Sequence, residues 1–148
     1  MPKSIEIPAL FRFDIPDDAL HVSDGKFHEV KDSADTYSVS IFAGSRAEQP
    51  STMTDIDIVK ELCRSMAEDS ILPAIGEGAK VFKYQDAQDG DYATAFAALG
   101  NAEIELSGMV FVRMKAGFDT IAVVSGTGDF EAISKVHQVI FHSLHVLS

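Results

Sequence analysis

Two segments with the periodicity of amphipathic helices divide a chain whose other apolar residues alternate as they do in strands. One helical segment follows Thr54 and the other follows Asp129, and turn residues separate the strand segments. The expected element order is β-β-β-α-β-β-β-β-α. This order predicts an α+β fold over residues 1–148, taken as a single domain, in which two main helices pack on a twisted, mostly antiparallel sheet.

Both helical segments begin at a residue that is able to cap a helix. Thr54 precedes the first segment, and Asp55 and Asp57 fall in its first turn, where the helix dipole favours acids. Asp129 takes the same place before the second segment. The first apolar stripe consists of Ile56, Val59, Leu62, Cys63 and Met66, and the second of Phe130, Ile133, Val136, His137, Ile140 and Leu144.

Alternating residues predict strands at 10–15, 27–30 and 36–43, before the first helix. Residues 80–85 and 92–99 form an expected hairpin around Asp89-Gly90, because Asp-Gly favours turns that match the twist of strands. Two further strands are expected at residues 103–115 and 119–125. Gly108, inside the longer of these two, is expected to mark a bulge or bend.

The strand at residues 92–99 has two unlike faces. Ala93, Ala95 and Ala97 form a face of small side chains, which suits the close approach of a helix or of another backbone. The opposite face carries Tyr92, Thr94 and Phe96, together with Met109 and Phe111 from the next strand.

This second face is the candidate binding surface, and it is rimmed by Glu103, Glu105, Arg113 and Lys115. Two interpretations are open. The face is a binding groove or a dimer interface, as exposed apolar patches often are. Alternatively, the other helix covers it, because large aromatic patches are usually buried.

The chain is acidic, with 23 acidic and 12 basic residues and a net charge of −11. This charge disfavours nucleic acid and anionic membranes, since phosphate binding needs clustered Lys and Arg. It suits a basic or an apolar partner. Cys63 is the only cysteine, so no disulfide forms within the chain and a reducing compartment is expected. The charged start of the sequence lacks the apolar core of a secretory signal, so we expect a cytoplasmic protein.

No pattern predicts a catalytic centre, and we expect neither a metal nor a cofactor. His142 and His145 are only two ligands, whereas zinc needs three or four, and both also suit the negative end of a helix. Cys63 lies in an apolar stripe, where a free cysteine usually acts as a small hydrophobe. Residues 125–128 lack the lysine of a phosphate-binding loop, and we expect a connection there.

Three parts of the sequence carry a resemblance to known proteins. They are the central helix, the opening Phe11-Arg12-Phe13-Asp14-Ile15-Pro16, and the closing Phe130 with Ile140-Phe141-His142-Ser143-Leu144. With the element order, they resemble the α/β/α sandwich of the photosystem PsbP proteins, of the small nuclear import factor that binds Ran, and of the bacterial Eag chaperones, which escort type VI secretion effectors. The resemblance covers nearly the whole chain. It implies a non-enzymatic binding role and transfers no specific binding residue.

We therefore expect a binding protein and not an enzyme. The leading hypothesis is an adaptor or chaperone-like protein that binds another polypeptide, such as an apolar helix of a secreted effector, on its sheet face. The second is an immunity protein whose acidic surface meets a basic toxin. The third is a small-ligand carrier, or an enzyme without a recognisable motif. A homodimer is also expected, because exposed strand edges or an aromatic sheet patch need cover.

Overall fold

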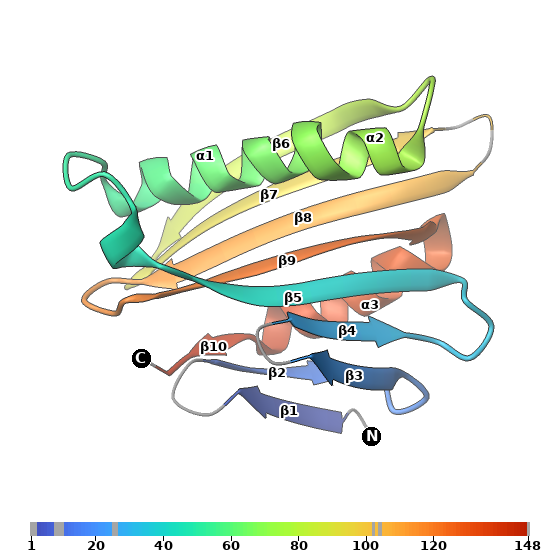
Figure 1. Ribbon diagram of the computed structural model, residues 1–148, viewed down its shortest axis with the longest axis horizontal. Coiled ribbons are helices and arrows are strands. Elements are labelled where there is room, and N and C mark those ends of the chain that lie inside the picture. Colours follow the sequence, from blue (N-terminus) through green and yellow to red (C-terminus); the bar gives the residue numbers. More distant parts are fainter. Residues whose placement is uncertain (1–2, 8–10, 25–26, 102, 104, 148) are drawn as a thin grey trace.

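The computed structural model describes residues 3–7, 11–24, 27–101, 103 and 105–147. Within them, a seven-stranded antiparallel sheet has the order β3-β4-β5-β9-β8-β7-β6, and a smaller sheet has the order β1-β2-β10 (Figure 1). The strands are β1 (Lys3–Ile7), β2 (Phe11–Ile15), β3 (Leu20–Asp24), β4 (Phe27–Lys31), β5 (Tyr37–Ser45), β6 (Lys80–Asp89), β7 (Tyr92–Asn101), β8 (Leu106–Lys115), β9 (Thr120–Asp129) and β10 (His145–Val146).

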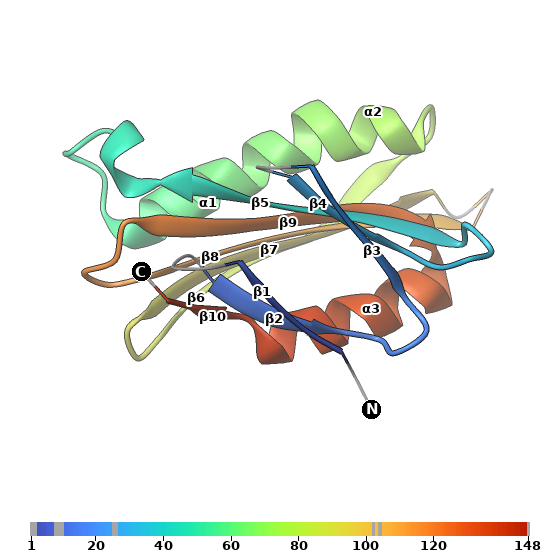
Figure 2. The ribbon, with the colours of Figure 1, turned by 60° about the horizontal axis from the view of Figure 1, so that its bottom comes forward.

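Helices lie on both faces of the large sheet (Figure 2). One face is covered by α1 (Asp55–Met66), a π-helical turn η2 (Ala67–Ile71) and α2 (Leu72–Ile75). The other face is covered by α3 (Phe130–Ser143) and by the small sheet. The predicted α+β fold, with a mostly antiparallel sheet and two main helices packed on it, is therefore confirmed.

The alanine face of β7 packs under α1, as the sequence predicts. The Thr54 side chain accepts a hydrogen bond from the Asp57 backbone N–H at 3.3 Å, so the expected N-cap is also present. Ala93, Ala95 and Ala97 are buried in the same core as the inner residues of α1. Because their side chains are small, the helix lies close to the strand.

Gly108 has a packing role, and the predicted bulge at this residue is wrong. β7 and β8 pair without a register shift where Leu99 faces Gly108. A Cβ atom at Gly108 would lie 2.5 Å from Cγ2 of Ile71, so glycine allows η2 to approach β8. The bulge of this sheet region lies in β6, between Val81 and Lys83.

Residues 125–128 lie within β9, so the connection expected there is also wrong. They pair with β5 on one side and with β8 on the other. A Cβ atom at Gly126 would lie 2.7 Å from the Ser38 carbonyl oxygen, so glycine permits the close approach of β5. Asp129 precedes α3 as predicted, but its side chain makes no capping hydrogen bond in the described structure.

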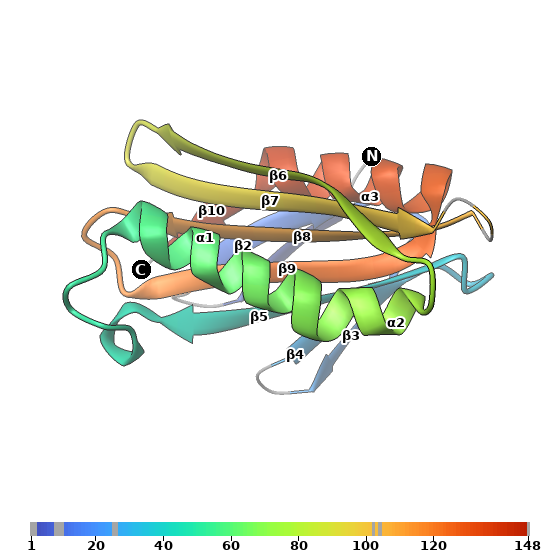
Figure 3. The ribbon, with the colours of Figure 1, turned by 90° about the horizontal axis from the view of Figure 1, so that it is seen from above.

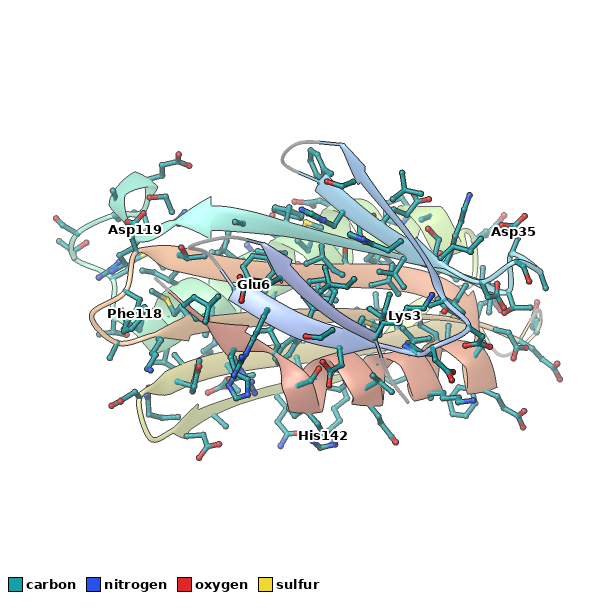
Figure 4. The ribbon with its side chains drawn as sticks, turned by 90° about the horizontal axis from the view of Figure 1, so that it is seen from below. Lys3, Glu6, Asp35, Phe118, Asp119 and His142 are labelled. Atoms are coloured by element: carbon teal, nitrogen blue, oxygen red, sulfur yellow. The ribbon has the colours of Figure 1, made fainter. Side chains whose placement is uncertain are left out.

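The second core lies between the large sheet on one side and α3 with the small sheet on the other. In Figure 4, α3 and the small sheet lie side by side in front of the large sheet. The predicted strand at residues 10–15 is β2, and Leu10 lies outside the described residues. Phe11 and Phe13 of β2 are buried against α3. The sequence did not predict β1, β3 or β10, and β10 pairs with β2 through Val146 and Phe11.

Candidate functional site between α3 and the edge strand β6

The predicted aromatic face is covered by α3 over most of its area. Phe111 is 0% exposed, Met109 is 3% exposed, and Thr94 is buried as well. The ring of Phe141 on α3 has its centroid 4.6 Å from that of Phe111. The interpretation that the other helix covers this face therefore agrees with the structure at Phe111. Met109 and Thr94 are buried as well, but they border an opening beside this helix.

Arg113 and Tyr92 hold the last residues of the chain against the sheet. Arg113 donates from Nη1 to the Leu144 carbonyl oxygen at 2.9 Å and from Nε to Thr94 Oγ1 at 3.3 Å. The Val146 N–H donates to the Tyr92 hydroxyl oxygen at 3.2 Å. Burial lowers the pKa of Arg113. These contacts give the two residues a structural role, and their part in a binding surface stays a prediction.

Glu103 and Glu105 lie in the turn between β7 and β8, so the strand predicted to start at residue 103 is wrong there. Asn101 pairs with Leu106, and the chain must reverse between them. Glu105 has a φ of 53°, in the left-handed region, which ends the extended conformation. Ala102 and Ile104 lie outside the described residues.

A groove remains open beside α3, because this helix lies on β2, β8 and β9 and leaves β6 and part of β7 uncovered. The groove has two adjoining parts, of about 670 and 230 Å³, and both are lined by Phe96 and His137. We call them together the α3 groove. The larger part is lined, among others, by Phe96, Ala98 and Met109 of the sheet, by Ile133, Ser134 and His137 of α3, and by Phe82 of β6.

Two exposed phenyl rings flank this groove. Phe82 is 64% exposed and Phe130 is 63% exposed, and both line its larger part. Phe130 was expected in the buried stripe of the last helix, and its exposure corrects that expectation. Phe82 is the extra residue of the β6 bulge, and its ring would lie 2.9 Å from a Cβ atom at Gly100. Glycine therefore makes room for this ring on the sheet.

The α3 groove is apolar along its floor and acidic at one end. The three charged residues that the structure places on its larger part are Glu105, Asp129 and Glu131. The His137 ring stacks on Phe96, with centroids 4.8 Å apart. Such a groove has the chemistry to bind an apolar segment that is flanked by a basic group.

The His137 ring lines the groove, and one of its nitrogen atoms is buried without a hydrogen-bond partner among the described residues. This atom is Nδ1. Burial, with a smaller contribution from the charge of His142, lowers the pKa of His137 to about 4. The imidazole is therefore neutral near pH 7.

A second groove, of about 380 Å³, lies on the opposite face between α1 and β6. Lys60, Arg64 and Asp86 give it charges of both signs, and Cys63 lies at its floor. Burial raises the pKa of Cys63 to about 12, so the thiolate is scarce near neutral pH. Cys63 is thus a small apolar core residue, as predicted from its position in the helical stripe.

Two further observations concern metal binding and membrane-spanning helices. Among the described residues, no group of three or more His, Cys, Asp and Glu side chains is placed to hold a metal ion. None of the helices in the described ranges combines the length and the apolar character needed to span a membrane.

Comparison with known proteins identifies the fold. No protein-family model matches the chain, and no curated protein matches it. The solution structure of the cyanobacterial PsbP protein from Synechocystis sp. PCC 6803 matches with a TM-score of 0.70 and 12% identity, over 98% of this chain and 92% of that one. The protein has a PsbP-like fold.

Two other solved structures support this result. The Ran-binding protein Mog1p of Saccharomyces cerevisiae matches with a TM-score of 0.62 and 13% identity, over 100% of this chain and 96% of that one. A structure from Bacteroides thetaiotaomicron matches with a TM-score of 0.51 and 13% identity, over 99% of this chain and 48% of that one. At this identity the likeness concerns the PsbP/Mog1-like fold alone.

Proposed function

We propose that the protein is a non-enzymatic, cytoplasmic binding module that holds an apolar segment of another polypeptide in the α3 groove. The observation that carries this proposal is the pair of exposed rings, Phe82 and Phe130, beside a cavity floored by Phe96. Exposed aromatic rings around an apolar cavity are typical of surfaces that a partner covers.

A polypeptide fits this site better than a small molecule does. The cavity of about 670 Å³ is within the size range of small-molecule sites. However, a ligand that fills it would leave the outer faces of Phe82 and Phe130 in water, whereas a polypeptide segment would cover them. A solved protein with this fold is described as Ran-binding, which supports a protein partner. The resemblance to the Eag chaperones of secreted effectors stays a prediction.

The acidic end of the groove favours a partner segment with a basic residue beside its apolar ones. Glu105, Asp129 and Glu131 lie there, and the whole chain carries a net charge of −11. The same charge supports a second candidate function, an immunity protein that inhibits a basic toxin. Salt separates the two candidates: rising salt weakens a charge-driven toxin complex strongly and affects an apolar complex little.

The test combines partner capture with a variant that fills the groove. The protein is purified from native lysate, and bound proteins are identified by mass spectrometry. Ser134 lines the groove and the neighbouring Lys135 is exposed outside it, so Ser134→Trp and Lys135→Trp form a matched pair. We expect Ser134→Trp to lose the partner and Lys135→Trp to keep it. Retention of a small metabolite with no protein partner, or equal binding by both variants, would contradict the proposal.

A further inference from the structure

The strand β6 is an open edge of the large sheet. Among the described strands it pairs only with β7, and nearly all of its ten residues are exposed. Figure 3 looks onto α1 and shows β6 at the border of the sheet, outside this helix. The opposite edge strand, β3, has only five residues. A long open edge offers a row of backbone N–H and C=O groups to another strand.

The second half of β6 is regular and suited to pairing. The bulge lies between Val81 and Lys83, and bulges and lysines are devices that protect sheet edges. From Lys83 to Asp89, in contrast, each residue of β6 faces one residue of β7 without a shift. The part of the edge that follows the bulge is therefore regular, with one lysine, Lys83, at its start.

The charges on this part change sign along the strand. Lys83 and Asp89 lie opposite Ala98 and Tyr92, which puts both on the α3 side of the sheet. In an antiparallel pair of two such strands, the basic end of each strand lies next to the acidic end of the other. We propose that β6 pairs antiparallel with β6 of a second copy of this chain across a two-fold axis, which makes one continuous sheet through a homodimer.

The charges also select the register. A two-fold axis normal to the sheet places the residue on the axis opposite its own copy. With Asp86 on the axis, Lys83 would face Asp89 of the second copy directly, but the two Asp86 carboxylates would face each other between these pairs. With Tyr84 on the axis, the bulge would enter the interface. With Gln85 on the axis, Lys83 faces Ala87 of the second copy, and Asp89 of that copy is its diagonal neighbour. This register has no like charges directly opposite each other, so we place Gln85 at the centre of the β6–β6 interface.

The dimer also extends the α3 groove. A two-fold axis normal to the sheet keeps both α3 helices on the same side, so each β6 forms a new border next to the groove of the other copy. The β6 residues Gln85 and Ala87 already line the smaller part of the groove. This consequence rests on the proposed function of the groove, whereas the pairing of β6 does not.

Cysteine cross-linking tests the pairing and its register. Residues directly opposite in antiparallel strands have Cα atoms about 4.5–5.5 Å apart, which a disulfide is able to bridge. Gln85 is exposed, and the native Cys63 is buried. We expect Gln85→Cys to form a covalent dimer on mild oxidation, faster than Ala87→Cys. Val22→Cys, on the exposed β3 edge, is the control and should stay monomeric.

Charge reversal provides an independent measurement. Lys83 and Asp89 are both exposed, so Lys83→Asp should fold normally and weaken dimerisation roughly tenfold in sedimentation. The double variant Lys83→Asp with Asp89→Lys should restore it. A wild-type chain that is monomeric at high concentration, or equal cross-linking of Gln85→Cys and Val22→Cys, would overturn the proposal. Ser134→Trp should leave the dimer intact, so failure of the dimer and failure of the groove are distinguishable.

Discussion

Phe96 and Phe111 lie directly opposite each other in β7 and β8, and α3 fully buries only one of them. Phe111 packs against Phe141 in the core, whereas Phe96 is partly exposed and lines the α3 groove. One cross-strand pair thus joins the core to the candidate site. The two rings have the same chemistry, so they serve as a matched pair in experiments.

The first prediction uses this pair. Phe111→Ala should lower the free energy of unfolding by about 3–5 kcal/mol, because it leaves a cavity in the core. Phe96→Ala should cost less, about 1–2 kcal/mol, because part of the ring is already in water, and it should weaken partner binding. Phe111→Asp should unfold the monomer. Denaturant unfolding measures these changes, and equal losses for both alanine variants would contradict the placement of α3.

The second prediction concerns pH. Burial lowers the pKa of His137 from 6.5 to about 4, so the unfolded chain binds a proton between these values that the folded chain does not. The folded state should therefore lose stability as the pH falls from about 6.5 to about 4, by roughly 2 kcal/mol in total. His137→Phe should remove this loss, and His145→Phe, at an exposed position, should keep it. Melting curves across this pH range provide the measurement.

The third prediction compares two buried or half-buried hydroxyl groups. The Tyr37 hydroxyl is buried with no hydrogen-bond partner among the described residues, and burial raises its pKa to about 12. Tyr37→Phe should therefore stabilise the protein by about 1 kcal/mol. Tyr92→Phe should destabilise it by about 1 kcal/mol, because the Val146 N–H loses its acceptor. The same sign for both variants in thermal unfolding would refute this assignment.

The fourth prediction concerns the contact between η2 and β8. A methyl group at Gly108 would overlap Cγ2 of Ile71, so Gly108→Ala should lower the free energy of unfolding by about 1–3 kcal/mol. Gly44 is the control, because a Cβ atom there would meet its nearest neighbour at 3.7 Å, an ordinary contact. Gly44→Ala should change stability little. Chemical denaturation of both variants checks the difference, and similar effects would show that the packing at Gly108 is loose.

Local patterns in the sequence were sufficient for the main elements. Apolar residues at helical spacing predicted α1 and α3, and the cap at Thr54 forms its hydrogen bond as expected. The alternation in β7 predicted that its alanine face suits the close approach of a helix or of another backbone, and α1 packs there. The hairpin between β6 and β7 was also predicted, although its two loop residues are Gly90 and Asp91, one position later than expected. These features depend on neighbouring residues, whose periodicity and turn preferences are visible in the chain.

Tertiary structure alone decided the site. The short strands β1, β3 and β10 exist because they pair with other strands, and β10 pairs with a strand more than a hundred residues earlier in the chain, so their own residues give little signal. The exposure of Phe130, the covering of Phe111 and the opening beside Phe96 all depend on where α3 lies on the sheet. An amphipathic stripe predicts that a helix is covered, but packing between distant segments sets which strands it covers and which it leaves open.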